Sequence, residues 1–239
     1  MATIKVEREN VKMVAHRGLS GLERENTNAA FVAAGNRTYF GIETDVRKTT
    51  DGVYYLFHDD ALTRVAGLQQ DVAACTWAQL RELTLFDMDD TKGRRDLLIP
   101  TLENYISICK KYGKVCVLEL KQVYTKEEIL QIVEIIRELE YLDQVIFISF
   151  FYEDLLLLRE ILPDQSAQFL TDVLDDTMIS KLRSDKLDAD IYYLSLTEEN
   201  IRAAHEAGLQ VNCWTVDSPE MAEQLIAWDV DYITTNILE

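Results

Sequence analysis

The chain has 239 residues, of which 48% are hydrophobic, so it is long enough to bury one large core. Its 42 acidic residues outnumber its 24 basic residues, and the formal net charge of −18 disfavours nonspecific binding to nucleic acid or to anionic lipid surfaces. An acidic protein of this kind can bind a phosphate only through a local cationic site or a metal ion.

Short apolar, β-branched runs alternate with longer segments of helical period along the chain. The predicted strands are centred on eight residues: Val14, Ile42, Val117, Ile146, Gln168, Tyr193, Val211 and Ile233. The predicted helices cover residues 28–34, 102–111, 126–140, 153–162, 176–184, 198–207 and 219–227. Thr27, Thr125 and Ser218, which precedes Pro219, are expected to cap three of these helices, and Gly113 and Gly208 to end two of them.

Eight strand–helix alternations in a chain of this length predict a (β/α)8 barrel. A doubly wound open sheet is the alternative. We expect one barrel domain over residues 1–239, with a small insertion after the second strand at about residues 46–99. Apolar residues at helical spacing within this segment are interpreted as a small core of its own.

A hairpin is predicted at the start of this insertion, because Asp51-Gly52 is a strong two-residue turn signal. With these two residues as the loop, Asp45 faces His58 across the hairpin. Cross-strand partners share one face of a sheet, and Glu43 lies on the same face by the period of two.

Three carboxylates stand where strands should bury apolar side chains. Glu43 and Asp45 alternate in "GIETDVRK", and Glu119 ends the strand "VCVLELKQ". Inward charges at the C-terminal ends of barrel strands lie at the catalytic face, and converging carboxylates repel one another unless a cation lies between them. Oxygen ligands suit Mg²⁺ or Ca²⁺, whereas solvated strand ends paired with Lys121 and Arg47 are the alternative.

Two of the three histidines also lie at predicted strand ends. His16 and His58 have the near-neutral pKa of a general acid–base pair, whereas His205 lies in a helical segment and is expected to be peripheral. Arg17, Lys121 and a divalent cation would supply the positive charge that a phosphate needs in this acidic chain.

Taken in order along the chain, these segments resemble the glycerophosphodiester phosphodiesterase family. The matching stretches are "AHRG" at 15–18, "ENT" at 25–27, "IETDV" at 42–46, "TTDG" at 49–52, "FHD" at 57–59, "IPTLEN" at 99–104, "LELK" at 118–121, "ISFF" at 148–151, "CWTVD" at 213–217 and "ITTN" at 233–236. The resemblance implies a (β/α)8 barrel with a small insertion after the second strand. It also implies that His16 and His58 are the catalytic acid and base and that Glu43, Asp45 and Glu119 bind one divalent cation, Mg²⁺ or Ca²⁺.

The resemblance further implies that Arg17 and Lys121 contact the phosphate and that Asn26 supports the phosphate or the first loop. Trp214 lies where the family usually has an aromatic residue at the barrel mouth; it packs on the glycerol or the leaving group, or is an ordinary rim aromatic. The family often has proline before "ENT", where this chain has Arg24, so we expect a less rigid loop. Many relatives also end with Thr-Asp and a proline, where this chain has "TTNILE".

The function implied is metal-dependent hydrolysis of a glycerophosphodiester to glycerol 3-phosphate and an alcohol. One rival is a lysophospholipase D-like activity of the same superfamily, which requires an exposed apolar lip. Others are a catalytically silent barrel that only binds phosphodiesters, and a sugar-phosphate isomerase, which gives no reason for three carboxylates beside two histidines. Which histidine acts first, the leaving alcohol and the oligomeric state stay open.

The expected surroundings of the protein follow from simpler features. Four scattered cysteines without a C-x-x-C pair predict reduced thiols in a cytoplasmic protein. No apolar run approaches the ~18 residues of a membrane span, and the polar N-terminus lacks the apolar core of a signal peptide. We therefore expect a small-molecule substrate, no nucleic acid and no integral membrane segment.

Overall fold

The computed structural model of the chain describes residues 2–239. Its strands are β1 (Lys12–Ala15), β2 (Gly41–Lys48), β3 (Tyr54–Leu56), β4 (Val115–Leu120), β5 (Val145–Ser149), β6 (Ala167–Thr171), β7 (Asp188–Tyr192), β8 (Val211–Trp214) and β9 (Tyr232–Thr235). Its helices are α1 (Asn28–Gly35), α2 (Thr63–Ala66), α3 (Trp77–Leu80), α4 (Leu102–Tyr112), α5 (Lys126–Glu138), α6 (Tyr152–Ile161), α7 (Asp176–Ser184), α8 (Glu198–Glu206) and α9 (Pro219–Ala227).

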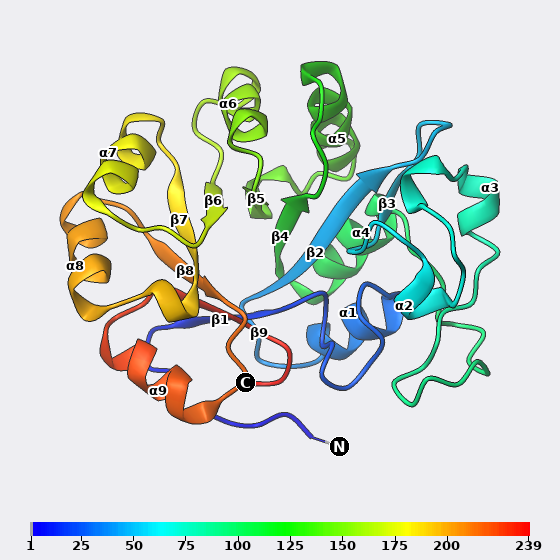
Figure 1. Cartoon of the computed structure of the whole chain (residues 1–239), viewed down its shortest axis with the longest axis horizontal. Coiled ribbons are helices and arrows are strands. Elements are labelled where there is room, and N and C mark those ends of the chain that lie inside the picture. The colour runs from blue at the N-terminus through cyan, green and yellow to red at the C-terminus, as the bar shows by residue number, and fades with distance from the viewer. Residues whose placement is uncertain (1) are drawn as a thin grey trace.

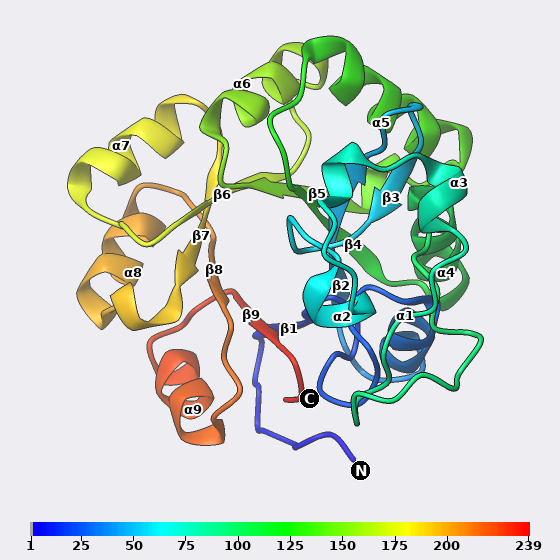
Figure 2. The ribbon, with the colours of Figure 1, turned by 45° about the vertical axis from the view of Figure 1, so that its right-hand side comes forward.

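Eight parallel strands form a closed barrel, as predicted. Their order is β1-β9-β8-β7-β6-β5-β4-β2, and pairing of β1 with β2 closes the ring. The strands lie inside a ring of helices, and the segment with α2 and α3 lies on the same side of the barrel as β3, on the right in Figure 1 and toward the viewer in Figure 2. The C-terminal ends of all eight strands therefore point to one mouth of the barrel.

Local signals in the sequence determine where the helices begin and end. The side chains of Thr27, Thr125 and Ser218 accept hydrogen bonds from backbone N–H groups in the first turns of α1, α5 and α9. Gly113 and Gly208 have φ of 63° and 84°, which glycine adopts without strain, at the ends of α4 and α8. These caps confirm the predicted capping residues, and the seven predicted helices begin and end within two residues of their predicted bounds.

The predicted position of the seventh barrel strand is wrong. Tyr193, the predicted centre of the seventh strand, lies just after β7 in a short 3-10 helix. The apolar run in the sequence begins at Ile191, but the strand begins earlier, at Asp188, and it includes Asp190, which is buried. The pattern of hydrophobic residues therefore placed the strand too late.

The predicted register of the hairpin is also wrong by one residue. Arg47 pairs with Tyr55, and Thr49 donates its backbone N–H to the Val53 carbonyl, so the loop has three residues and includes Gly52 at φ 90°. A three-residue loop with a glycine in the left-handed region is a common alternative to the two-residue turn. Asp45 consequently lies opposite Phe57, and not opposite His58 as predicted.

The chain buries three groups of apolar side chains. The largest lies between the barrel and its helices, and a smaller one, which includes Val14, Val117 and Leu170, fills the barrel interior. The segment between β3 and α4 has its own group around Val72 and Leu80, as expected for the insertion. None of the helices formed by residues 2–239 has the length and hydrophobicity of a membrane-spanning segment.

Candidate functional site

A cavity of about 190 Å³ opens at the mouth of the barrel. It is lined by residues on or just after all eight barrel strands and from the segment after β3: His16, Arg17, Glu43, His58, Glu119, Lys121, Ile148, Phe150, Leu170, Asp190, Trp214, Thr215 and Thr234. One side is charged and the other is largely apolar. Most of the predicted site residues therefore meet in one place, although His16 and Trp214 lie 198 positions apart in the sequence.

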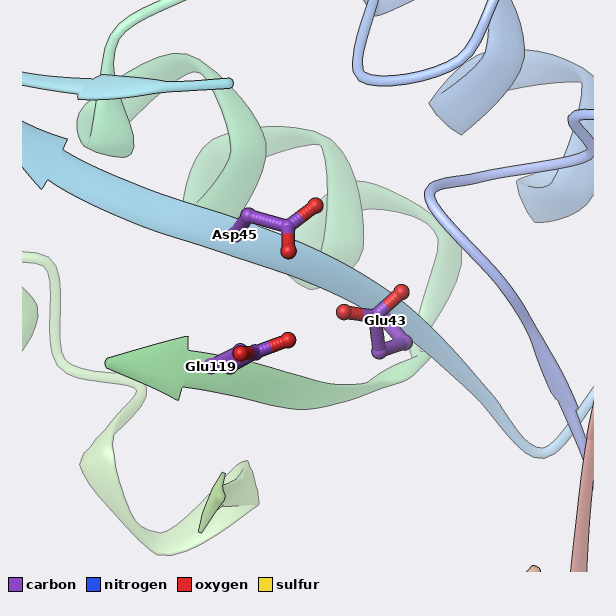
Figure 3. Close-up of side chains that lie close together, drawn as sticks. All are labelled: Glu43, Asp45 and Glu119. Atoms are coloured by element: carbon purple, nitrogen blue, oxygen red, sulfur yellow. The ribbon is translucent and has the colours of Figure 1, made fainter. Parts of the chain in front are cut away.

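The three predicted metal ligands form a cluster on two neighbouring strands. Glu43 and Asp45 come from β2 and Glu119 from β4, where Asp45 and Glu119 are partners in register. Each offers an oxygen within 4.8 Å of the others, and their carboxylates converge beside the two strands (Figure 3). All three residues are buried, with 3%, 0% and 6% of their surface exposed. Glu43, Asp45 and Glu119 are together called the carboxylate cluster below.

Burial and mutual repulsion control the charge of the carboxylate cluster. Burial, together with Asp45 and Glu119, raises the pKa of Glu43 well above its usual value. Burial and the neighbouring Asp45 raise the pKa of Glu119 to about 8, although Lys121 opposes this. Burial also disfavours charge on Asp45, but Arg17 and Lys121 outweigh it and lower the pKa of Asp45.

These properties fit a divalent cation. The donors are carboxylate oxygens, the ligands that Mg²⁺ and Ca²⁺ prefer. Asp45 Oδ1 is buried and lies 3.2 Å from Lys121 Nζ, yet it accepts no hydrogen bond from residues 2–239. Since buried polar atoms normally have partners, an unsatisfied oxygen in a group of three carboxylates indicates a site built for a cation.

The two predicted phosphate ligands lie on either side of the carboxylate cluster. Lys121 Nζ is 2.9 Å from Glu119 and 3.2 Å from Asp45. Arg17 donates to Glu25 at 2.9 Å, whereas its buried Nε has no acceptor among the described residues and lies 3.6 Å from Asp45. One donor of Arg17 is therefore directed toward the site without a hydrogen-bond partner in the protein.

The turn that carries Arg17 is tightly constrained. Arg17 has φ 52°, a conformation that costs a non-glycine residue free energy, and its backbone N–H donates to Glu43 at 2.8 Å. Gly18 follows at φ 77°, where a Cβ atom would lie 2.7 Å from the backbone of Ala30. Only glycine fits there, so α1 packs directly against this turn.

His16 is oriented by Asn236 from the end of the last strand. His16 Nδ1 lies 2.8 Å from Asn236 Oδ1, while the amide nitrogen of Asn236 donates to Asp217 at 2.6 Å. Because Asp217 fixes which end of the amide faces His16, Nδ1 carries the proton and Nε2 is the free acceptor. Burial, with Arg17, lowers the pKa of His16 to about 4, so the imidazole is neutral.

His58 has a charged partner. Its Nδ1 lies 2.8 Å from a carboxylate oxygen of Asp59, which leaves Nε2 as its free ring nitrogen. Arg64 of α2 donates to Asp59 at 2.7 and 2.9 Å and to Glu25 at 2.6 and 2.7 Å. Burial lowers the pKa of His58, and Asp45 opposes this change.

Three arginines attach the insertion to the barrel. Arg47 of β2 donates to the Phe57 and His58 carbonyls at 3.0 and 2.7 Å and thereby fixes the backbone of His58. Arg24 donates to the backbone carbonyls of residues 86 and 87. Its side chain therefore holds the first loop where the family often has proline. Arg64 makes the third connection, through Glu25.

Asn26 and Trp214 occupy different parts of the site. Asn26 donates to Asp45 at 2.7 Å and accepts from Thr44 at 2.7 Å, so its amide supports the carboxylate cluster. Trp214 lines the cavity, donates its indole N–H to the Asp190 carbonyl at 3.3 Å and contacts the Phe150 ring edge-on at 5.4 Å between centroids.

The predictions missed several residues that contact the site: Arg47, Asp59, Arg64, Asp190, Asp217 and Asn236. Asp59 could have been found from "FHD", since a carboxylate beside a candidate histidine is a common partner. Asp190 had a signal too, because it is a carboxylate among apolar residues of a strand. Nothing in the sequence connects Arg64 with Glu25 or Asn236 with His16.

Comparison with known proteins identifies the family of this chain. The family model for the glycerophosphoryl diester phosphodiesterase family matches residues 16–239. A Bacillus altitudinis glycerophosphodiester phosphodiesterase is 28% identical over 233 residues, which cover 94% of each chain.

Solved structures are similar over nearly the whole length. A Parabacteroides distasonis glycerophosphodiester phosphodiesterase aligns with a TM-score of 0.81 at 25% identity, covering 96% of this chain and 94% of the other. An Oleispira antarctica phosphodiesterase, solved with its product sn-glycerol-3-phosphate, aligns with a TM-score of 0.85 at 23% identity and shows the shared fold, covering 97% and 95%. The match of the family model over nearly the whole chain shows that this protein belongs to the glycerophosphoryl diester phosphodiesterase family of hydrolases.

Proposed function

We propose that the protein hydrolyses glycerophosphodiesters to glycerol 3-phosphate and an alcohol with the help of one divalent cation. The observation that carries this proposal is the meeting of two histidines, three carboxylates and two cationic side chains around one cavity at the barrel mouth. Each group has a use in phosphodiester hydrolysis.

The phosphate is held by charge from several directions. Glu43, Asp45 and Glu119 would hold Mg²⁺ or Ca²⁺, which would supply positive charge for the phosphate and promote ionisation of the nucleophile. Arg17 donates its free Nε–H to the phosphate, and the Lys121 ammonium lies close enough to the carboxylate cluster to contact the same anion. These fixed donors stabilise the negative charge that develops on phosphorus oxygens as the bond breaks.

The partners of the two histidines support an assignment of their roles. His16 has a neutral amide partner, Asn236, so its imidazole stays neutral and its Nε2 removes the proton from the nucleophile. His58 has a carboxylate partner, Asp59, which favours the imidazolium form and opposes the lowering of the His58 pKa by burial, so we assign to His58 the transfer of a proton to the leaving alcohol. The nucleophile is water or the adjacent glycerol hydroxyl, and trapping of a cyclic phosphate would identify the hydroxyl.

The first experiment measures release of glycerol 3-phosphate from glycerophosphocholine and glycerophosphoethanolamine with EDTA, Mg²⁺ or Ca²⁺. We expect metal-dependent turnover that His16→Ala and Glu43→Ala abolish. His205→Ala is the matched control, because His205 lies on the peripheral helix α8 and pairs with Asp231. This variant should leave turnover unchanged. Wild-type protein that hydrolyses neither diester with either metal would contradict the proposal.

A second experiment separates the acid from the base by means of the leaving group. p-Nitrophenolate leaves without a proton, whereas choline needs one. His58→Ala should therefore lower turnover of glycerophosphocholine by about 10²- to 10⁴-fold and that of glycerophospho-p-nitrophenol much less. His16→Ala should lower both, and the opposite pattern would reverse the assignment.

A second candidate, lysophospholipase D-like hydrolysis, has one observation in its favour. Large apolar side chains are exposed in the loops that follow four consecutive barrel strands, β4 to β7: Val123, Phe150, Phe151, Val173 and Leu194. Because these strands are neighbours, the loops form one apolar side of the mouth, here called the apolar rim. Such a rim is the lip that an acyl chain would contact.

Lysophosphatidylcholine tests this candidate directly. If the apolar rim binds an acyl chain, lysophosphatidylcholine should be hydrolysed at least as fast as glycerophosphocholine, and Phe151→Ser should lower only the former rate. Leu130→Ser, which removes an exposed apolar side chain of helix α5, is the control. Turnover of glycerophosphocholine alone would leave the first candidate in place.

A further inference from the structure

Asp190 is a buried carboxyl group of the cavity that neither the carboxylate cluster nor the histidines use. It lies on β7, across the barrel from β2 and β4, and only 1% of its surface is exposed. Its Oδ1 is buried without a hydrogen-bond partner among residues 2–239. Buried polar atoms without partners are rare and costly, so this one requires an explanation.

The polar neighbours of Asp190 are engaged elsewhere. Asn212, its partner in register on β8, donates to Gln168 at 3.1 Å and accepts from Thr234 at 3.2 Å. The indole N–H of Trp214 donates to the backbone carbonyl of Asp190 and not to its side chain. The barrel interior therefore satisfies its other polar side chains with one another and leaves the Asp190 carboxyl toward the cavity.

Burial decreases across the cavity from the floor to the mouth. Asp190, Leu170 and Thr234 are at most 4% exposed, whereas Phe150 at the rim is 45% exposed. Asp190 thus belongs to the closed end. Glycerophosphodiesters share glycerol phosphate and differ in the second alcohol. The shared glycerol phosphate therefore fits the closed end of the cavity, and the second alcohol extends to solvent.

We propose that Asp190 binds a hydroxyl group of the substrate's glycerol and so recognises the glycerol moiety. This inference rests on the proposed function and specifies which part of the diester the cavity recognises. A carboxyl group can both donate to and accept from a hydroxyl when it is protonated. Burial, with Glu119 nearby, raises the pKa of Asp190 well above its usual value, which agrees with the protonated form. An acyl ester on the same hydroxyl would remove the donor, so this contact disfavours a lysophospholipid that is acylated at that position.

The test compares two ligands that differ only in their hydroxyl groups. Binding of sn-glycerol 3-phosphate and of n-propyl phosphate to the Mg²⁺-loaded protein is measured by calorimetry for wild type, Asp190→Leu and Asp190→Asn. One neutral hydrogen bond changes affinity by about tenfold. In Asp190→Leu, we expect the dissociation constant of n-propyl phosphate divided by that of glycerol 3-phosphate to fall by about tenfold. The cause is weaker binding of glycerol 3-phosphate alone. Asp190→Asn, which keeps a donor and an acceptor, should stay within about threefold of wild type.

Each outcome decides the question. An unchanged ratio in Asp190→Leu, or equal weakening of both ligands, would overturn the inference. A loss in Asp190→Asn as large as in Asp190→Leu would mean that an anion is required and would also overturn it. Asp190→Leu should have an unchanged or higher melting temperature, because it removes an unsatisfied buried group, and Asp190→Ala gives the same comparison if leucine does not fit. Failure of wild type to hydrolyse any glycerophosphodiester would contradict the proposed function but leave this binding comparison valid.

Discussion

Proton release should accompany the binding of a divalent cation to the carboxylate cluster. The oxygens of Glu43, Asp45 and Glu119 lie within 4.8 Å of one another. With an effective dielectric constant of about 20, two ionised carboxylates at that distance repel each other by about 3.5 kcal/mol. This is enough to keep a proton on at least one member at neutral pH, in agreement with a pKa of about 8 for Glu119.

Because a cation binds the ionised carboxylates, it must displace these protons. We expect Mg²⁺ or Ca²⁺ binding at pH 7 to release about one to two protons, with less release above pH 8 as Glu119 ionises by itself. Calorimetry in buffers with different ionisation enthalpies measures the number directly. Affinity should rise with pH between about 6 and 8 for the same reason.

Matched variants identify the source of the protons. Glu119→Gln should release about one proton fewer and bind the cation more weakly, since it removes one titrating ligand. Asp154→Asn is the control, because Asp154 is another buried carboxyl, with its pKa raised by burial to about 6, that lies outside the site. Release of no protons at pH 7 would refute the reasoning from burial and repulsion, and equal release by wild type and Glu119→Gln would place the protons elsewhere.

Further predictions concern the supports of the site and its stability. Arg64→Ala should lower kcat about tenfold, and Arg64→Lys should partly restore it. The free energy of unfolding should change by less than about 1 kcal/mol. A decrease in kcat no greater than that of Arg81→Ala, a surface control, would contradict this prediction. Asn236→Asp should raise the pKa of His16 from its low value. In a pH–rate profile, the loss of activity on acidification should then begin at a higher pH. An acid limb at an unchanged pH would argue against His16 as the base. In EDTA, the melting temperature should decrease as the pH rises from 5 to 8. The raised pKa of Glu119 makes the folded state bind more protons than the unfolded state in this range. Mg²⁺ should abolish the decrease, and a melting temperature independent of pH in EDTA would contradict the prediction.

The sequence predicted best what depends on neighbouring residues. Helix ends followed from caps such as Thr125, and the alternation of Glu43 and Asp45 predicted one shared face because a strand has a period of two. The position of Glu119 beside them followed from the barrel, which brings the C-terminal ends of the strands to one mouth.

The sequence predicted least well what depends on backbone geometry or on distant contacts. The hairpin register differed by one residue because a three-residue loop with Gly52 competes with the two-residue turn. His58 still reaches the cavity because the chain has left β3 by that point and Arg47 fixes its backbone. Contacts such as Arg64 with Glu25 depend on how the insertion packs, and no local pattern encodes that packing.

The contact between His16 and Asn236 makes the proposed base a marker of late folding. These residues are separated by 220 positions in the sequence, and β1 and β9, which carry them to the site, pair only when the ring closes. Contacts of such long sequence separation form slowly, since the entropy of closing the intervening chain opposes them. During synthesis, His16 is made 220 residues before its orienting partner. An unclosed barrel would thus hold its carboxylates on β2 and β4 before it holds an oriented base, and cation binding could precede catalytic competence during folding.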